Sequence, residues 1–333
     1  MDNALAAEQI DRLVTCDLNV RSFFPALYEA ARNAQGGPLC QGAADRLHNA
    51  FANSSAGPVL FITGFYSPVL GVGEQDGPVG TAYLARVLEQ AYGAVPVVVT
   101  DTGQISLVTQ TLRGGGFNVI GLETALESAR IGKGKAASVI DFPVRLDDAS
   151  REAQRLLDML EPRAIIAIER PGRNVAGKPH SLGAIELKDT TAATDVLLSQ
   201  ARDRGCTSIA IADAGNETGS GVIHDEVNRI LGEERRCKVC GEGIAAVEAA
   251  EVLVIAAVSN WGAYGVAAAL ALELGDVELL PGVDVLEWTI RACALAGGRN
   301  GMSDWTDPGS DGLPLATDLG VLTMLRTLVQ TPG

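Results

Sequence analysis

Three polar residues that could do chemistry lie within five positions of one another. Asp213, Asn216 and Glu217 occur in the stretch DAGNE, directly after an apolar run at 209–212. Two carboxylates in so small a space suit general acid–base catalysis, in which one group accepts a proton and another donates one. The simpler interpretation is a tight turn and then a helix whose N-terminus one of these side chains caps.

The elements around this stretch point to an α/β fold. The chain has 333 residues and alternates short apolar runs with amphipathic segments. The apolar runs are continuous, which is typical of parallel strands buried on both faces. We therefore predict a mostly parallel, Rossmann-like sheet with helices on both faces. Residues 1–56 are predicted to be an N-terminal helical extension and residues 57–333 the α/β domain. Two lobes meeting at a cleft are the alternative.

Polar residues follow the predicted strands at their carboxyl ends. In an open α/β sheet these ends lie along one edge, where ligands bind. We therefore expect their side chains to converge on a single site. The residues concerned are Thr63, Gly64, Asp76, Asp101, Glu169, Arg170, Arg173, Asp213, Asn216, Glu217, Ser259, Asn260 and Trp261.

Several of these residues also have structural interpretations. Asp76 precedes a Gly-Pro pair and fits the N-cap of the helix that follows it. Asn260 could cap the helix after its own strand, or hold a polar group of a substrate. Arg170 and Arg173 suit a substrate carboxylate, and ion pairs with nearby acids are the alternative. Trp261 is expected either in the core or as the wall of a ligand site.

Charge and composition exclude some classes of function. The net charge of −15 and the pI of about 4.6 argue against nucleic acid as a partner. We find no signal-peptide pattern and no membrane-spanning run, and expect a cytoplasmic protein with six reduced cysteines. Cys237 and Cys240 form a CxxC pair, but no second ligand pair at matching spacing is evident, so zinc is not expected.

Several segments together resemble the D-glutamate cyclase family. They are FITGFYSPVLGVGEQDGPVGTAYLARVLE, IAIERPGRNVAGKPHSLGAIEL, IAIADAGNETGSGVI, VLVIAAVSNWGAYGVAAALA and the closing TDPGSDGLPLATDLGVLTMLR. Their order and spacing agree over nearly the whole chain. The resemblance implies a carbon–oxygen lyase that closes D-glutamate to 5-oxo-D-proline with loss of water.

The resemblance also implies roles for the candidate residues. Asp213, Glu217 and Glu169 are the expected catalytic residues. No cofactor is required by the sequence, although Asp213 and Glu217 could hold Mg²⁺ or Mn²⁺ as a Lewis acid. The expected substrate-binding residues are Gly64, Asp76, Arg170, Arg173, Asn216, Asn260, Trp261 and Asp311.

Two departures from the family pattern bear on the substrate. Ala212 and Ala214 stand where the family prefers glycine, and the segment 174–187 differs from its usual version. We expect a small acidic amino acid or a cyclic amide as substrate. The alternatives are a hydrolase that opens a small lactam or cyclic imide, and a non-catalytic protein that binds an acidic metabolite. A homo-oligomer is compatible with the sequence.

Overall fold

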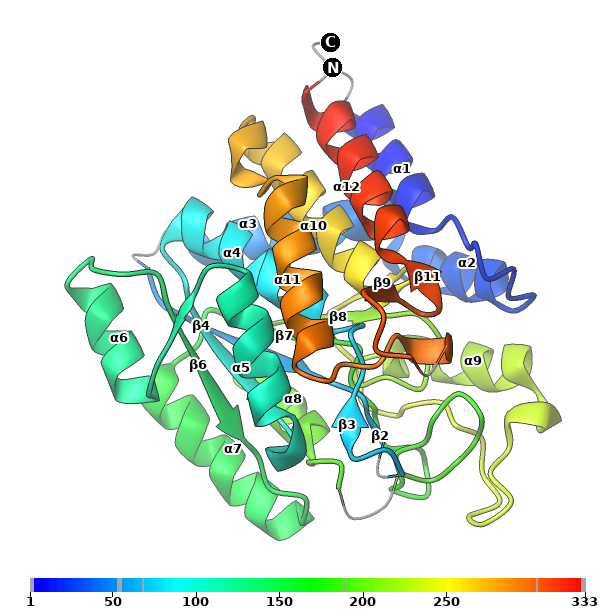
Figure 1. The fold of residues 1–333 in the computed structure, drawn as a ribbon. Coiled ribbons are helices and arrows are strands. Elements are labelled where there is room, and N and C mark those ends of the chain that lie inside the picture. The colour runs from blue at the N-terminus through cyan, green and yellow to red at the C-terminus, as the bar shows by residue number, and fades with distance from the viewer. Residues whose placement is uncertain (1–2, 53–55, 68, 188–189, 304, 331–333) are drawn as a thin grey trace.

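A seven-stranded parallel sheet forms the centre of the protein (Figure 1). The computed structural model describes residues 3–52, 56–67, 69–187, 190–303 and 305–330. The strand order is β5-β6-β4-β1-β7-β8-β9, and neighbouring strands are parallel throughout, which confirms the predicted α/β class. The strands are β1 (Pro58–Thr63), β4 (Val95–Thr100), β5 (Asn118–Val119), β6 (Ala136–Asp141), β7 (Ala164–Ile168), β8 (Thr207–Ala212) and β9 (Val252–Ile255).

The direction in which the chain crosses the sheet changes at β1. This strand pairs with β4 on one side and with β7 on the other. The chain first builds the β4 side and then returns through α7 (Leu146–Leu160) to β7. Such a reversal opens a crevice beyond the carboxyl ends of the two middle strands, where ligands of doubly wound sheets bind.

Helices cover both faces of the sheet, because a right-handed crossover puts its helix on one face when the chain moves one way across the sheet and on the other face when the chain moves back. On one face, three helices pack on β1, β4 and β6 to β9: α4 (Pro78–Tyr92), α5 (Ile105–Gly114) and α10 (Ser259–Leu274). Two more helices, α11 (Val283–Leu295) and α12 (Leu315–Gln330), pack on the outside of these three. The opposite layer contains α7, α6 (Leu122–Arg130) and α8 (Thr194–Asp203). Figure 1 shows α10 to α12 above the sheet and α6 and α7 below it. In the described ranges no helix is both long and apolar enough to cross a membrane.

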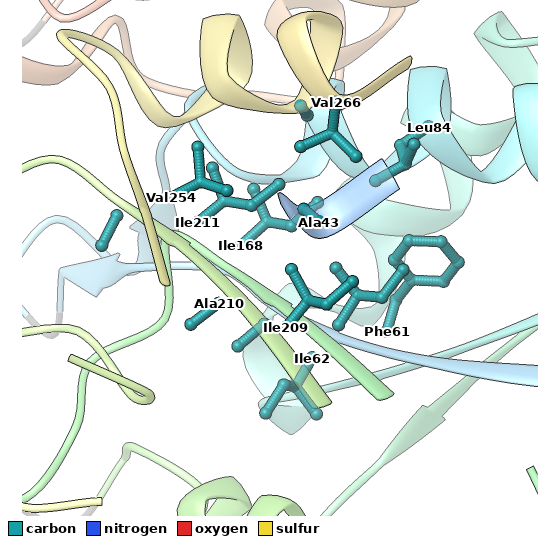
Figure 2. Packing of buried hydrophobic residues seen from close by; sticks show 14 of the residues in the cluster. Ala43, Phe61, Ile62, Leu84, Ile168, Ile209, Ala210, Ile211, Val254 and Val266 are labelled. Carbon is teal, nitrogen blue, oxygen red and sulfur yellow. The ribbon is translucent and has the colours of Figure 1, made fainter. Parts of the chain in front are cut away.

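The first three helices pack into the same hydrophobic core as the sheet. They are α1 (Asn3–Val14), α2 (Phe24–Gln35) and α3 (Leu39–Phe51). The helices α1 and α3 lie against α10, and α3 also reaches β8 and β9. Figure 2 shows Ala43 of α3 beside the strand residues Ile168 and Ile211, with Val266 of α10 above them. The N-terminal helices therefore bury their apolar faces on the sheet and on α10.

Gln35, the last residue of α2, closes the free edge of β9. Its Nε2 donates to the Leu253 carbonyl at 2.9 Å, and its Oε1 accepts from the Leu253 N–H at 2.9 Å. These are the main-chain groups of Leu253 that a further strand would bind. One side-chain amide thus satisfies both of them at the edge of the sheet.

The chain after β8 differs from our prediction of a helix soon after Glu217. Residues 213–220 form an irregular loop, and α9 (His224–Leu231) begins only after a 3₁₀ turn at Gly221–Ile223. Gly215 and Gly219 have φ angles of +89° and +101°, which a right-handed helix does not allow. The loop is therefore held in a compact shape of its own.

The helices α4 and α10 approach each other closely near their N-termini. A Cβ atom added to Gly80 would lie 2.9 Å from the Cα of Asn260 and 3.0 Å from the Cβ of Ala263. The first contact is with backbone, so it could be relieved only by moving a helix. The absence of a side chain at Gly80 thus sets the spacing of the two helices.

We predict that Gly80→Ala lowers the free energy of unfolding by roughly 1–3 kcal/mol, because overpacking forces a backbone shift. The matched control is Gly42→Ala in α3, where the added Cβ meets nothing within 4 Å. There we expect a gain of about 0.5–1 kcal/mol. Urea denaturation measures both changes, and equal effects at the two positions would contradict the close helix contact.

Candidate active site

Five carboxyl groups meet beyond the carboxyl ends of the central strands. Oxygen atoms of Asp76, Asp213 and Asp311 lie within 4.8 Å of one another, and so do those of Glu169, Asp213 and Glu217. Asp213 belongs to both groups, so the five acids form one carboxylate cluster. Each residue is less than one tenth exposed. The fold therefore brings together five of the six acids that we expected at this edge, and the sixth, Asp101, is instead paired with Arg170.

Glu169 follows β7 with a strained backbone. Its φ is +45°, and positive φ angles also occur at Asp311 (+50°) and at Val20 (+53°), the neighbour of Arg21. These are three of the five non-glycine residues with positive φ in the described part of the chain. Each such residue costs of order 1–3 kcal/mol, and they gather at functional sites. The positive φ angles therefore indicate a functional site at the same place as the cluster of acids.

The loop after β8 folds back so that Glu217 binds its own backbone. The Glu217 carboxylate accepts hydrogen bonds from Ala214 N at 3.2 Å and Gly215 N at 2.6 Å. This compact loop replaces the expected start of a helix. It turns Glu217 toward Asp213, the first residue after β8, and so brings the two carboxylates to the same space.

Asp76 and Asn260 cap each other's helices. Asp76 accepts from Ser259 N at 3.0 Å and from Asn260 N at 2.7 Å, at the first two residues of α10. The Oδ1 of Asn260 accepts from Gly77 N at 3.0 Å and Gly80 N at 2.6 Å, at the start of α4. The caps that we expected, Asp76 on α4 and Asn260 on α10, were wrong, because each side chain binds the N-terminus of the other helix. Both N-termini lie beside the carboxylate cluster, where their positive dipole ends favour negative charge.

Ser259, the first residue of α10, connects this exchange of caps to Glu169 at the end of β7. The Ser259 hydroxyl donates to Glu169 Oε2 at 2.6 Å. Ser259 is therefore held by Asp76 through its backbone and binds Glu169 through its side chain. Two acids from distant parts of the chain are thus positioned by a single residue.

Asp311 reaches the cluster from a short hairpin. The strands β10 (Gly309–Ser310) and β11 (Leu313–Pro314) are joined by Asp311 and Gly312, with φ angles of +50° and +79°. Two residues with positive φ form a type I′ turn, for which Asp-Gly is a preferred sequence. The turn chemistry thus explains how a carboxylate projects at this position.

The guanidinium in the cluster belongs to Arg21, which we had not expected there. Its Nη1 bonds Asp213 at 2.5 Å, its Nη2 donates to Ala257 O at 2.6 Å, and its Nε donates to Asp17 at 3.3 Å. Burial lowers the pKa of Arg21, but Asp213, Asp17 and Asp311 outweigh it and raise the pKa. Arg21 lies in the loop between α1 and α2, where no periodicity or motif marks it.

Burial and mutual repulsion change the acidity of the cluster. For Asp76, Glu169, Glu217 and Asp311, burial is the largest cause that raises the pKa, and neighbouring acids of the cluster raise it further. The charge of Arg21 acts in the opposite direction on the pKa of Asp311. A carboxyl group with a raised pKa keeps its proton to a higher pH than usual and is better suited to act as an acid.

Asn216 presents an oxygen with no protein partner. Its Nδ2 donates to the main-chain oxygen of His180 at 2.9 Å. Its Oδ1 is buried and has no hydrogen-bond partner among the described residues. Such an oxygen costs free energy unless a ligand or water satisfies it. Asn216 is therefore suited to accept a hydrogen bond from a substrate.

Arg170 has a structural role instead of the expected substrate contact. All five of its N–H groups are bound inside the protein, to Thr194, Gly64 O, Ala192 O and both carboxylate oxygens of Asp101. None is left for a substrate carboxylate. Gly64, another expected binding residue, contributes the carbonyl that helps to hold Arg170.

Arg173 and Trp261 also lie apart from the carboxylate cluster. Arg173 pairs with Asp195 at 2.8 Å on the wall of a cavity of about 420 Å³, which none of the five acids lines. Trp261 is fully buried and donates its Nε1 to Asp318 at 3.1 Å. Of its two interpretations, the structure supports the core residue.

Comparisons with known proteins agree with the sequence resemblance. A family described as D-glutamate cyclase-like, C-terminal, matches residues 11–326, which include Arg21 and the five acids. The chain belongs to this family. The human protein named mitochondrial D-glutamate cyclase is 34% identical over 107 residues. That alignment covers 32% of this chain and only 16% of the human protein.

The site of this D-glutamate cyclase-like chain also has the donors that a hard cation prefers. Each triad of carboxylates offers oxygen ligands, which suit Mg²⁺ or Mn²⁺. Asp213 is common to both triads and is also the partner of Arg21. An ion at either triad would reduce the repulsion among the acids.

We predict that Arg21→Met lowers the free energy of unfolding by about 3–5 kcal/mol at neutral pH, because it leaves a buried acid unpaired. Without Arg21 the pKa of Asp311 rises further, so the folded state binds protons that the unfolded state releases. Stability then falls more steeply with rising pH than in the parent protein. Denaturation at pH 5 and pH 8 measures this, and an equal loss at both values would contradict it.

A second pH prediction concerns Asp318 of α12, beside the site. Burial raises its pKa from 3.8 to about 7, although Trp261 and Ser310 donate to it and oppose the rise. The folded state therefore keeps a proton that the unfolded state loses, and stability falls as pH rises from about 4 to 7. We expect Asp318→Asn to flatten this part of the stability profile. An unchanged slope in thermal unfolding between pH 4 and 7 would count against it.

Proposed function

We propose that the protein closes D-glutamate to 5-oxo-D-proline with loss of water. Family membership supports the reaction class, and the cluster of five buried acids around Arg21 is the observation that carries the proposal. Lactam closure moves protons from an ammonium group to a departing oxygen. A cluster that contains both acids with raised pKa values and an ion-paired carboxylate is suited to both transfers.

The reaction balances without a redox partner. The α-amino nitrogen, after losing a proton, attacks the γ-carboxyl carbon and a C–N bond forms. A C–O bond of that carboxyl group breaks. The two protons lost by the ammonium group end on the departing oxygen, which leaves as water. Protein groups need only pass protons and hold the two ends of the substrate together.

The acids divide into two roles in this proposal. Asp213, in its ion pair with Arg21, is placed to accept a proton from the substrate ammonium. Glu169 and Glu217, whose pKa values are raised by burial and by Asp213, are placed to donate a proton to the departing oxygen.

Arg21 replaces Arg170 as the proposed partner of the substrate α-carboxylate. Among the described residues, acceptors occupy three of its five N–H groups, at Asp17, Asp213 and Ala257. The other two are available for a planar carboxylate, which guanidinium groups bind well. The free Oδ1 of Asn216 would accept from the substrate amine.

We further propose that a divalent cation, Mg²⁺ or Mn²⁺, assists the reaction at the carboxylate cluster. D-Glutamate carries negative charge, and each acid of the cluster that has lost its proton makes the approach of the substrate less favourable. An oxygen-bound cation removes this repulsion and supplies Lewis-acid stabilisation of a carboxylate oxygen. Asp213 with Asp76 and Asp311 would hold it while Glu169 and Glu217 donate protons. With Asp213, Glu169 and Glu217 as its ligands, the cation would take the place of the proton donors at the departing oxygen.

The test is a substrate panel with the purified full chain. D-Glutamate, L-glutamate, 5-oxo-D-proline, small lactams and cyclic imides are each incubated with Mg²⁺, Mn²⁺ or EDTA, and products are separated by chromatography. Formation of 5-oxoproline from D-glutamate, lost in EDTA, is the expected result. Ring opening of a lactam or imide alone would favour the hydrolase. Thermal stabilisation by glutamate without any turnover would favour a binding protein.

We predict that Glu217→Gln, Glu169→Gln and Asp213→Asn each reduce turnover by about 10²–10⁴-fold, because each removes a proton-transfer group. The matched control is Asp11→Asn. Asp11 is a buried acid outside the cluster that accepts from Leu39 N and Cys40 N. It is expected to keep near-parental rates. Retained activity in the Glu217 and Asp213 variants would exclude the proposed site.

A further inference from the structure

A second group of metal-ligating side chains lies outside the carboxylate cluster. One ligand atom each from His180, Cys237 and Cys240 lies within 4.8 Å of the other two. Both cysteines are free thiols. His180 and Cys237 are buried, and Cys240 is partly exposed, which leaves a path for an ion to enter. The CxxC pair seemed to lack a partner because the histidine is 60 residues away in the chain.

The orientation of His180 suits a metal ligand. Its Nδ1 lies 3.0 Å from the main-chain oxygen of Lys178, which accepts a hydrogen bond and so places the ring proton on Nδ1. The lone pair on Nε2 then faces Cys240, whose Sγ is 3.6 Å away. Metal-bound histidines normally donate their other N–H to a carbonyl or carboxylate in this way. Tetrahedral zinc, with its usual bond lengths, places sulfur and nitrogen ligands about 3.6 Å apart.

The CxxC turn directs both sulfurs to the same side. Val239 N donates to Cys237 Sγ at 3.4 Å, and Gly241 N donates to Cys237 O at 2.9 Å. Gly241 has a φ of +77°, which allows the chain to turn immediately after the second cysteine. Backbone N–H groups directed at sulfur favour the thiolate, which is the form that binds metal.

Glu186 lies near this group but is not part of it. It pairs with His180 across an antiparallel bridge, and its carboxylate lies 3.6 Å from Lys178 Nζ. The ligand atoms within 4.8 Å of one another are those of His180, Cys237 and Cys240. One imidazole and two thiolates leave the fourth position of a tetrahedral zinc ion to water, which can reach it because Cys240 is partly exposed.

We propose that Cys237, Cys240 and His180 bind a zinc ion, with water as its fourth ligand. The ion would join the segment 174–187 to the turn at 236–243. Asn174 already links the same two segments, since its Nδ2 donates to Gly243 O at 2.7 Å. The site also lies next to the active site, because Asn216 donates to the main-chain oxygen of His180. Zinc would therefore hold the segment in which this chain departs from the family pattern. The proposal is independent of whether the protein cyclises glutamate.

The test measures metal content and a thiolate signature. The full chain, purified under reducing conditions, is expected to contain about one zinc per chain. Cys237→Ser and Cys240→Ser should lose it, and the matched control Cys206→Ser should keep it. Chelated protein titrated with Co²⁺ should develop thiolate-to-cobalt charge-transfer absorption, which carboxylate-bound cobalt does not show. Limited proteolysis should cut within 174–187 faster after chelation.

The cobalt titration of the unaltered chain decides the matter even if the serine variants do not fold. Reduced protein with neither zinc nor a thiolate–cobalt band would overturn the proposal. So would a loss of metal in Cys206→Ser equal to that in the CxxC variants. A Cys237–Cys240 disulfide whose reduction yields no metal binding would assign a redox role to the pair instead.

Discussion

The exchange of caps between Asp76 and Asn260 is the interaction on which the site depends. Two side chains satisfy four N–H groups at the starts of two helices. Since α4 follows β1 and α10 follows β9, the exchange connects strand ends on both sides of the crevice. It also places Ser259 where its hydroxyl reaches Glu169. A buried carboxylate is tolerable here because helix N–H groups and their dipoles stabilise its charge.

The remaining acids are harder to accommodate. Arg21 is paired with one of them, and burial raises the pKa of the others. An arrangement of this kind reduces the stability of the folded chain and is retained in proteins where chemistry requires it. The large apolar core, which continues from the sheet into the N-terminal helices, offsets that cost. Protons, a cation or an anchored substrate would each relieve the repulsion in a different way.

Much of the fold was predictable because buried parallel strands require continuous apolar runs, and their polar ends must share one edge. That reasoning led to Glu169, Asp213 and Glu217. It could not lead to Arg21, which reaches the site across 192 residues and lies in an unmarked loop. The cap exchange was equally hidden, since an acid before a helix fits its own helix equally well. In both cases the deciding contact is between segments whose proximity only the folded chain creates.

Gln35 has a consequence for how copies of the chain can associate. An edge strand with unpaired main-chain groups is a template on which another chain can add a strand. At β9 the amide of Gln35 already occupies the groups of Leu253, and the opposite edge, β5, is only two residues long. Neither edge offers a ladder long enough to continue the sheet into a neighbour. The central sheet is thereby protected against edge-to-edge polymerisation, and an assembly of copies would form through surfaces other than the edges of this sheet.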